Sequence, residues 1–206
     1  GRKTFGNITK YILNTISANL GNMMTVAISS LFLNFIPLLP SQILLNNFVS
    51  DVPLLTVSTD NVDPNFLKKP KKWNMPFISK FMVYFGLLST VFDLALIIPL
   101  YFVFNATPEL FRTTWFVSSA LTEIVVTFAI RTKKPFFKSR PSTMLIAASV
   151  ITALATIAVT YTAFGASFFE FVKMPAMILG FALALVAAYF LSAEVMKRFF
   201  FKKFEM

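Results

Sequence analysis

The chain has 206 residues, of which 56% are hydrophobic and only 14% are charged. Soluble domains average about 45–50% apolar and about 25% charged residues, so this composition excludes a disordered chain and favours a membrane protein. Cysteine and histidine are both absent, which excludes disulfide bonds, thiolate or imidazole metal sites and histidine-dependent catalysis. The net charge of +10 would suggest nucleic-acid binding in a soluble protein, but here the membrane is the first interpretation to test.

Six stretches are long and apolar enough to be membrane-spanning helices, which need about 20 mostly apolar residues. They cover residues 5–36, 38–57, 78–104, 113–130, 143–164 and 175–196. The first stretch would be about 48 Å long as a helix, against a hydrocarbon core of about 30 Å, so we expect its polar first turns to extend into the cytosol as a stalk. The predicted fold class is therefore all-α, a polytopic membrane protein with a single transmembrane domain over residues 1–206.

The basic residues predict how these spans are oriented. Seventeen of the nineteen Lys and Arg residues fall before or at the start of the first span, between the second and third or at the start of the third, between the fourth and fifth, or after the sixth. Only Arg112 and Lys173 fall on the other side. Segments rich in Lys and Arg are cytoplasmic, so this alternation predicts six spans with both termini in the cytoplasm. The positive charge is then explained by topology and by contact with anionic lipids, and nucleic acid is not an expected partner.

The segment between the second and third spans carries two further signals. Pro64, Pro70 and Pro76 predict that residues 58–77 are mostly irregular. The run of lysines at residues 68–72 is interpreted as an anchor at the membrane surface, with a regulatory contact to another domain as the alternative.

Polar residues inside the predicted spans are few, and such residues usually face a cavity or a pathway. Counted from the turn at residues 36–40, the polar residues of the first two spans lie at similar depths, about 16 to 21 Å into the membrane. The two spans are joined by this short turn, so we expect them to be adjacent antiparallel helices whose polar clusters meet. In the first span the cluster is Asn19 and Asn22, whose face Thr25 and Ser29 extend, and in the second it is Asn46, Asn47, Ser50 and Asp51.

The chemistry of these side chains points to a hard cation. Pro53 cannot donate a hydrogen bond to the carbonyl of Val49, which frees a backbone oxygen beside Asp51. A broken helix that exposes carbonyls beside a carboxylate is one way in which membrane proteins build cation sites. Carboxylate, amide, hydroxyl and carbonyl oxygens suit Mg²⁺ or Ca²⁺, not zinc or copper.

Several of these residues also have purely structural interpretations. Asn19 is as well explained by a hydrogen bond to a neighbouring helix as by metal binding. Asp93 is expected to be a gating or structural residue, paired with Ser89 or Thr90, in preference to a direct ligand. Glu123 is an additional candidate ligand, for which the structural alternative stays open.

Four segments resemble P-type ATPases. Residues 1–12, Gly-Arg-Lys-Thr-Phe-Gly-Asn-Ile-Thr-Lys-Tyr-Ile, resemble the segment that leads from the phosphorylation domain into the fifth membrane helix. Residues 17–22, Ser-Ala-Asn-Leu-Gly-Asn, are similar to the ion-site segment of that helix. Residues 37–51, which end in Asn-Phe-Val-Ser-Asp, look like the following turn and the sixth helix, whose Asn-x-x-x-Asp element binds ions. Residues 66–73 resemble the loop after it.

Within that superfamily the chain is most similar to prokaryotic magnesium-transporting pumps. Asn22 stands where calcium pumps have a glutamate. The Lys-Lys-Pro-Lys-Lys-Trp sequence at residues 68–73, the Ser-Thr-Val-Phe-Asp sequence at residues 89–93 and the ending at residues 196–204 also fit. A site with fewer carboxylates should hold a divalent ion loosely or partly hydrated, which is consistent with Mg²⁺ because this ion sheds water reluctantly.

The resemblance implies both a function and a set of ligands. The chain would form the fifth to tenth membrane helices of a translocase in the cell membrane of a prokaryote, which couples ATP hydrolysis to Mg²⁺ uptake through an aspartyl-phosphate. By position, Asn19, Asn22, Asn47, Ser50 and Asp51 match the ion-site residues of the family, and Glu123 falls close to the acidic position of the eighth helix in calcium pumps.

No catalytic residue is expected in this chain. It has no Asp-Lys-Thr-Gly-Thr phosphorylation sequence, no Thr-Gly-Asp hinge and no glycine-rich phosphate loop, so ATP would be bound only by cytoplasmic domains outside it. Its expected partners are those domains and the first membrane helices of the same pump. The alternatives are a P-type pump for another cation such as Ca²⁺, a self-contained six-helix channel or secondary transporter, and a membrane scaffold.

Overall fold

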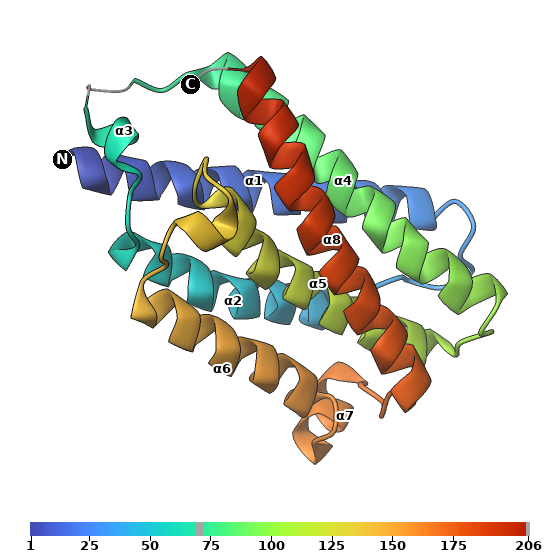
Figure 1. Cartoon of the computed structure of the whole chain (residues 1–206). Helices are drawn as coiled ribbons and strands as arrows, with labels where there is room; N and C mark the ends of the chain where they lie inside the picture. Colours follow the sequence, from blue (N-terminus) through green and yellow to red (C-terminus); the bar gives the residue numbers. More distant parts are fainter. Residues whose placement is uncertain (69–71, 205–206) are drawn as a thin grey trace.

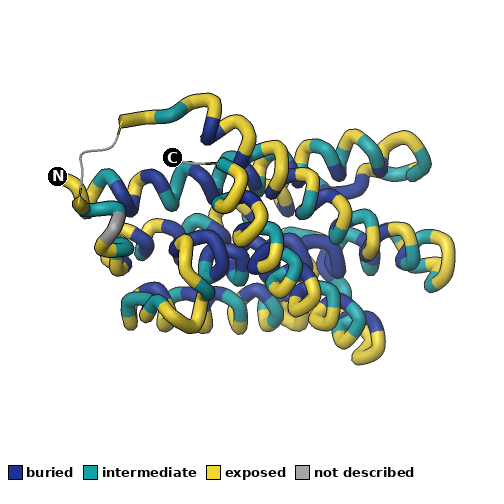
Figure 2. The backbone as a smooth tube through the Cα atoms, turned by 45° about the horizontal axis from the view of Figure 1, so that its top comes forward, coloured by how far each residue is buried: buried dark blue, intermediate teal, exposed yellow. Residues whose placement is uncertain are grey.

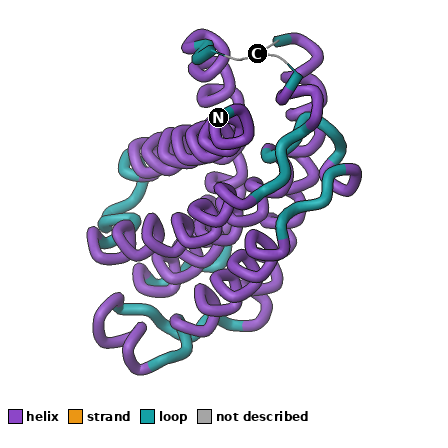
Figure 3. The backbone as a smooth tube through the Cα atoms, turned by 90° about the vertical axis from the view of Figure 1, so that its left-hand side faces the viewer, coloured by secondary structure: helices purple, strands orange, loops and turns teal. Residues whose placement is uncertain are grey.

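The structure is a computed structural model that describes residues 1–68 and 72–204. Within this part of the chain it contains helices and loops and no strand, as predicted (Figure 3). The middle of the lysine run, residues 69–71, lies outside the described residues. The long helices are α1 (Arg2–Ser29), α2 (Pro40–Thr56), α4 (Met75–Phe102), α5 (Pro108–Ile130), α6 (Thr143–Val159) and α8 (Ala176–Lys203). The short ones are η1 (Val57–Thr59), α3 (Pro64–Leu67), η2 (Phe136–Lys138) and α7 (Ala163–Phe169).

The long helices alternate in direction along the chain. α1, α4 and α6 begin at the end of the bundle that carries both chain termini, and α2, α5 and α8 end there (Figure 1). We call this the terminal end of the bundle. Contacts between the helix ends agree with this arrangement, because Asn7 Nδ2 donates to the carbonyl of Ser58 at 2.9 Å and Lys197 Nζ donates to the carbonyl of Ala129 at 2.7 Å.

α5 is the central helix of the bundle. In its most apolar window 89% of the residues are buried, against 28% for α8, and buried residues run through the middle of the bundle (Figure 2). Its aromatic side chains Phe111, Trp115 and Phe116 belong to the largest buried cluster, together with Leu96 and Leu100 of α4. The apolar residues of α4 and α8 that remain exposed form a surface suited to lipid.

Among the described residues, three helices are long and apolar enough to cross a membrane, namely α4, α5 and α8. α6 and α7 meet the same criteria only as a pair bent by 75°, which would make a fourth span if the pair counts as one. α2 is short, with 17 residues, and α1 has 28 residues but carries many polar side chains. These two helices hold five of the six residues that were expected to bind a cation, and the sixth, Glu123, lies on α5.

The connection between α1 and α2 differs from the prediction. α1 ends at Ser29, seven residues before the end of the first predicted stretch, and residues 30–39 form the connection. The hydroxyls of Ser29 and Ser30 both donate to the carbonyl of Val26, at 3.1 and 2.7 Å, where the helix ends. Such local bonds compete with the continuing helix, which accounts for the earlier end.

α1 and α2 run antiparallel, as expected, but the expectation that they pack against each other was wrong. α1 packs mainly on α4, whereas α2 packs mainly on α5 and α6. Glycine explains the preference of α1 for α4. A Cβ on Gly21 would lie 2.8 Å from Ser89 Cβ, and one on Gly86 would lie 2.9 Å from the side chain of Leu20. Small residues of this kind let two helix backbones approach closely.

Candidate cation site

A polar cavity of about 220 Å³ lies between α1, α2 and α5. Five of the six predicted ligands line it, from all three helices. They are Asn19 of α1, Asn47, Ser50 and Asp51 of α2, and Glu123 of α5, together with Tyr11, Asn14, Thr15, Ala18 and Leu54. The polar clusters of the first two helices therefore do face a common space, although the helices themselves are not packed together.

Helix periodicity explains why these residues share the cavity. On α2 the lining residues are spaced by three and four, from Asn47 through Ser50 and Asp51 to Leu54, so they form one face. On α1 the same spacing runs from Tyr11 through Thr15 to Asn19. Pro53 lies inside α2, next to this face, and cannot donate to the carbonyl of Val49.

The sixth predicted ligand, Asn22, is held against α5. Its Nδ2 donates to Glu123 Oε1 at 2.8 Å, and its Oδ1 accepts a hydrogen bond from the hydroxyl of Ser119 at 3.2 Å. Asn46 of α2 reaches the same two residues, since its Nδ2 donates to Glu123 Oε1 and to Ser119 Oγ, both at 3.3 Å. The Glu123 carboxylate is thus the point at which polar groups of α1, α2 and α5 meet.

Asp93 lies away from this cavity and links α1 to α4. It is 3% exposed, and its Oδ2 accepts a hydrogen bond from the hydroxyl of Thr25 at 2.8 Å. The expected pairing with a hydroxyl of its own helix was wrong in the case of Thr90, whose hydroxyl donates to the carbonyls of Gly86 and Gly21. Threonine in a helix commonly bonds the carbonyl four residues before it. This geometry fits the structural interpretation of Asp93.

Several polar residues of this region were not among the predicted ligands, and three of them bear on the site: Ser119, Thr15 and Asn46. Ser119 lies one turn before Glu123, and Thr15 lies one turn before Asn19, so helical spacing from a predicted ligand was the available signal for both. The hydroxyl of Thr15 is buried beside the cavity without a hydrogen-bond partner. Asn46 precedes Asn47 and faces α5, a contact that depends on how the helices pack and not on spacing along α2.

The cavity is electrostatically unbalanced. Its ten lining residues include the carboxylates of Asp51 and Glu123 and no Lys or Arg. Within residues 1–68 and 72–204 no group of three or more acidic, His or Cys side chains gathers in a way that could hold a metal ion. The site therefore offers two carboxylates supplemented by amide and hydroxyl oxygens, a ligand set that suits a hard divalent cation which keeps some of its water.

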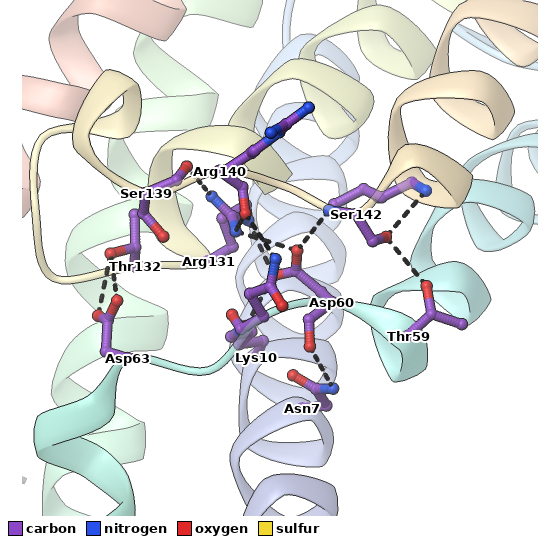
Figure 4. Close-up of polar contacts among 12 residues, drawn as sticks. Asn7, Lys10, Thr59, Asp60, Asp63, Arg131, Thr132, Ser139, Arg140 and Ser142 are labelled. Carbon is purple, nitrogen blue, oxygen red and sulfur yellow. Dashed lines mark hydrogen bonds and ion pairs between the residues drawn. The ribbon is translucent and has the colours of Figure 1, made fainter.

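A second polar cluster lies at the terminal end, where a buried carboxylate is paired with basic side chains (Figure 4). The fully buried carboxylate of Asp60, just after η1, accepts two hydrogen bonds from Arg131, at 2.8 and 3.0 Å, and one from Lys10 at 2.7 Å. The backbone N–H of Ser142 donates to it at 3.1 Å. Asp60 thereby joins α1, the segment after α2, and the connection between α5 and α6.

The charges around Asp60 set its protonation. Burial acts to raise the pKa of this carboxyl, but the hydrogen bonds and positive charges of Arg131 and Lys10 outweigh burial and leave the pKa below its ordinary value. Asp60 therefore stays ionised with its partners, and its carboxylate has no capacity left for a metal ion.

A buried lysine fastens α8 at the same end. Lys197 Nζ lies 2.7 Å from Glu194 Oε2 and donates to the carbonyls of Ala129 and Lys134, also at 2.7 Å. The Glu194–Lys197 pair thus connects α8 to the carboxyl end of α5.

Comparison with known proteins places this geometry in context. Residues 35–199 match the family described as "Cation transporting ATPase, C-terminus". Over 209 aligned positions, 99% of the chain is 34% identical to the protein named "Magnesium-transporting ATPase, P-type 1" of Escherichia coli K12. It is 33% identical to the protein of the same name from Salmonella typhimurium strain 14028s, again over 99% of the chain. The chain spans 23% of the length of each of these relatives.

Proposed function

The chain belongs to the family of cation-transporting ATPases, as its C-terminal membrane region, and we propose that it carries the cation-binding site of an ATP-driven Mg²⁺ transporter. The observation that carries this proposal is the cavity between α1, α2 and α5, with its two carboxylates and no balancing basic residue. The names of the two bacterial relatives support Mg²⁺ as the transported ion.

In this proposal the six long helices all cross the membrane, with both termini in the cytoplasm. Their alternating direction supports this topology, and so does the concentration of basic residues in the segments that meet at the terminal end (Figure 1). α1 and α2 then span despite their polar content, because their polar faces line the cavity and are shielded from lipid. The membrane is the cell membrane of a prokaryote.

The transported ion would be held by oxygen atoms from three helices. Asp51 and Glu123 supply negative charge, while Asn19, Asn47 and Ser50 supply neutral oxygens around the same cavity. Asn22 contributes through its hydrogen bond to Glu123. The small number of carboxylates favours Mg²⁺ with part of its water over a fully dehydrated ion. A pump for another cation such as Ca²⁺ is the second candidate.

Energy for transport would come from outside the described helices. ATP binding and aspartyl phosphorylation are assigned to cytoplasmic domains of the same pump, and the first membrane helices of that pump would complete the site. α1 begins at the terminal end and continues to Asn19 and Asn22 without a break, so a tilt of its amino-terminal turns moves these side chains relative to α2 and α5. Anionic lipids are proposed as partners of the basic residues at the terminal end.

The test is the Asp51→Asn variant in the full-length pump, reconstituted in liposomes. MgATP is held constant on the side of the ATPase domains, and Mg²⁺ is varied on the opposite side. We expect Mg²⁺ uptake to be lost while the variant still inserts, because the substitution removes one of two carboxylates. Asp63→Asn is the matched control: Asp63 accepts a hydrogen bond from Thr132 at the terminal end and should leave uptake unchanged. Normal uptake by Asp51→Asn would rule out the site, and coupling to Ca²⁺ in place of Mg²⁺ would favour the second candidate.

A further inference from the structure

The adjacent asparagines of α2 point in different directions. Asn47 is exposed and lines the cavity. Asn46 is 3% exposed, does not line the cavity, and has its amide turned toward α5. Successive residues of a helix are separated by about 100°, so one face of α2 can serve the cavity while the next serves α5.

The amide of Asn46 closes a ring of hydrogen bonds with Glu123, Asn22 and Ser119. Its two N–H hydrogens go to Glu123 Oε1 and to Ser119 Oγ. The hydroxyl of Ser119 donates a hydrogen bond to Asn22 Oδ1, and Asn22 Nδ2 donates one to Glu123 Oε1, which closes the ring. Each polar hydrogen in the ring takes part in one hydrogen bond, and every acceptor is an oxygen with a free lone pair. The reverse orientation of the Asn46 amide would place its oxygen against a carboxylate oxygen, so the direction of these bonds is determined.

Both amide nitrogens meet the same oxygen of Glu123. With Oε1 held at 2.8 Å by Asn22 and at 3.3 Å by Asn46, Oε2 is the oxygen of this carboxylate that remains for the cavity. We propose that Asn46, together with Ser119, is a positioning residue that fixes the Glu123 carboxylate for cation binding. This inference rests on the proposed role of Glu123 as a ligand of the transported ion.

A purely structural role does not explain an asparagine at this position. Its Oδ1 is buried without a hydrogen-bond partner, which costs free energy. A leucine of similar volume would avoid that cost and would pack as well between α2 and α5. Leucine has no N–H donors, whereas the two N–H groups of Asn46 donate to Glu123 and to the hydroxyl of Ser119, which in turn bonds Asn22.

The ring also links two helices whose main packing partners differ. α1 packs mainly on α4 and α2 mainly on α5 and α6, yet an amide from each ends on one atom of Glu123. A shift of either helix therefore changes how the carboxylate is held. Ion affinity is thereby coupled to the relative position of α1 and α2.

The test compares Asn46→Leu with Gln42→Leu in the full-length pump. Gln42 is the matched control because it is a fully buried amide one turn earlier on α2, bonded to the carbonyl of Phe169 at 2.6 Å and remote from Glu123. Mg²⁺ uptake into liposomes gives the half-saturating Mg²⁺ concentration and the maximal rate. We expect Asn46→Leu to raise the half-saturating concentration about ten-fold with the maximal rate within about two-fold, since loss of an outer partner of a metal ligand typically costs 10–100-fold. Gln42→Leu should leave that concentration unchanged.

Two results would overturn the inference. One is an unchanged half-saturating concentration in Asn46→Leu; the other is an equal shift in both variants, which would make the effect structural. If the Asn46→Leu protein fails to accumulate, the Ser119→Ala variant is used instead. A rise of about three-fold in its half-saturating Mg²⁺ concentration supports the inference, and no rise overturns it.

Aspartate substitutions separate a positioning residue from a ligand. Asn47→Asp adds a carboxylate oxygen to the cavity, and its half-saturating concentration should be at or below that of the unmodified pump. Asn46→Asp removes both donors and places a second carboxylate against Glu123, so the concentration should rise about ten-fold or more. If Asn46→Asp and Asn47→Asp change the half-saturating Mg²⁺ concentration equally, the inference is contradicted. If Asp51→Asn is inactive while Asn46→Leu is normal, this inference alone fails; if Asp51→Asn is normal, the proposed function fails as well.

Discussion

Two buried carboxylates of this protein have opposite surroundings. Asp60, at the terminal end, is paired with Arg131 and Lys10 and accepts a backbone N–H as well. Glu123, in the middle of the bundle, is held by the neutral amides of Asn22 and Asn46, and the cavity beside it contains a second carboxylate and no basic residue. Both tie three segments of the chain together, but only Asp60 is neutralised within the described structure.

The difference indicates what each residue is for. A buried charge without a partner is costly, so it persists where function needs it. The countercharges of Asp60 are supplied by Arg131 and Lys10 of the same chain, which is typical of an ion pair that stabilises the fold. Glu123 lacks one, which is consistent with the proposed site that an external cation would complete.

The largest expected effect comes from removing the Asp60 carboxylate from its ion pairs. Asp60→Asn should lower the free energy of unfolding by about 3–5 kcal/mol, because it leaves Arg131 and Lys10 buried without their counterion. Thermal unfolding of the purified full-length pump would measure this as a lower melting temperature. The variant that remains folded should keep its half-saturating Mg²⁺ concentration; a weakened Mg²⁺ response with unchanged stability would contradict a structural role.

The converse variant, Glu123→Gln, should affect the ion and not the fold. We expect the half-saturating Mg²⁺ concentration for uptake to rise about 100-fold or more, because a charged ligand is lost while the glutamine oxygen still accepts from Asn22 and Asn46. The melting temperature measured without Mg²⁺ should stay the same or increase, since an unbalanced buried charge is removed. A large loss of stability with normal uptake would reverse the contrast between the two carboxylates.

The smallest effect is a dependence of stability on pH. The pKa of Asp60 is lowered in the folded protein, so its contribution to stability is complete above the pKa of an unfolded aspartate, about 3.9, and is lost as the pH falls further through the folded value. Between pH 5 and 7 this residue should therefore cause no change, and below about pH 4 stability should decline. The decline should be shallower in Asp60→Asn, and an equal acid response of both proteins would show that Asp60 is not its source.

Much of this arrangement could be predicted from the sequence because it depends on local periodicity. Residues spaced by three and four on one helix face the same way, which is why Asn47, Ser50 and Asp51 appear together in the cavity. Asn19 and Glu123 were predicted as polar residues inside apolar spans, and the resemblance to a known family then matched their positions to its ion-site residues.

The rest required knowledge of packing between helices. The packing of α1 against α4 could not be predicted from the sequence, because it depends on the close contact between Gly21 and Ser89 across the interface. The orientations of Asn46 and Asn22 likewise depend on where α5 lies. The partners of Asp60 come from residues 71 and 50 positions away, a separation over which sequence spacing carries no information.

The most direct test of the central claim is to locate the ion itself. Crystals or frozen grids of the full-length pump would be prepared with Mn²⁺, which shares the preference of Mg²⁺ for oxygen ligands and gives a detectable anomalous or density signal. The account predicts an ion in the cavity between α1, α2 and α5, with oxygens of Asp51 and Glu123 within about 2.5 Å or bridged to it by one water. An ion bound elsewhere in the membrane region, with this cavity empty, would contradict it.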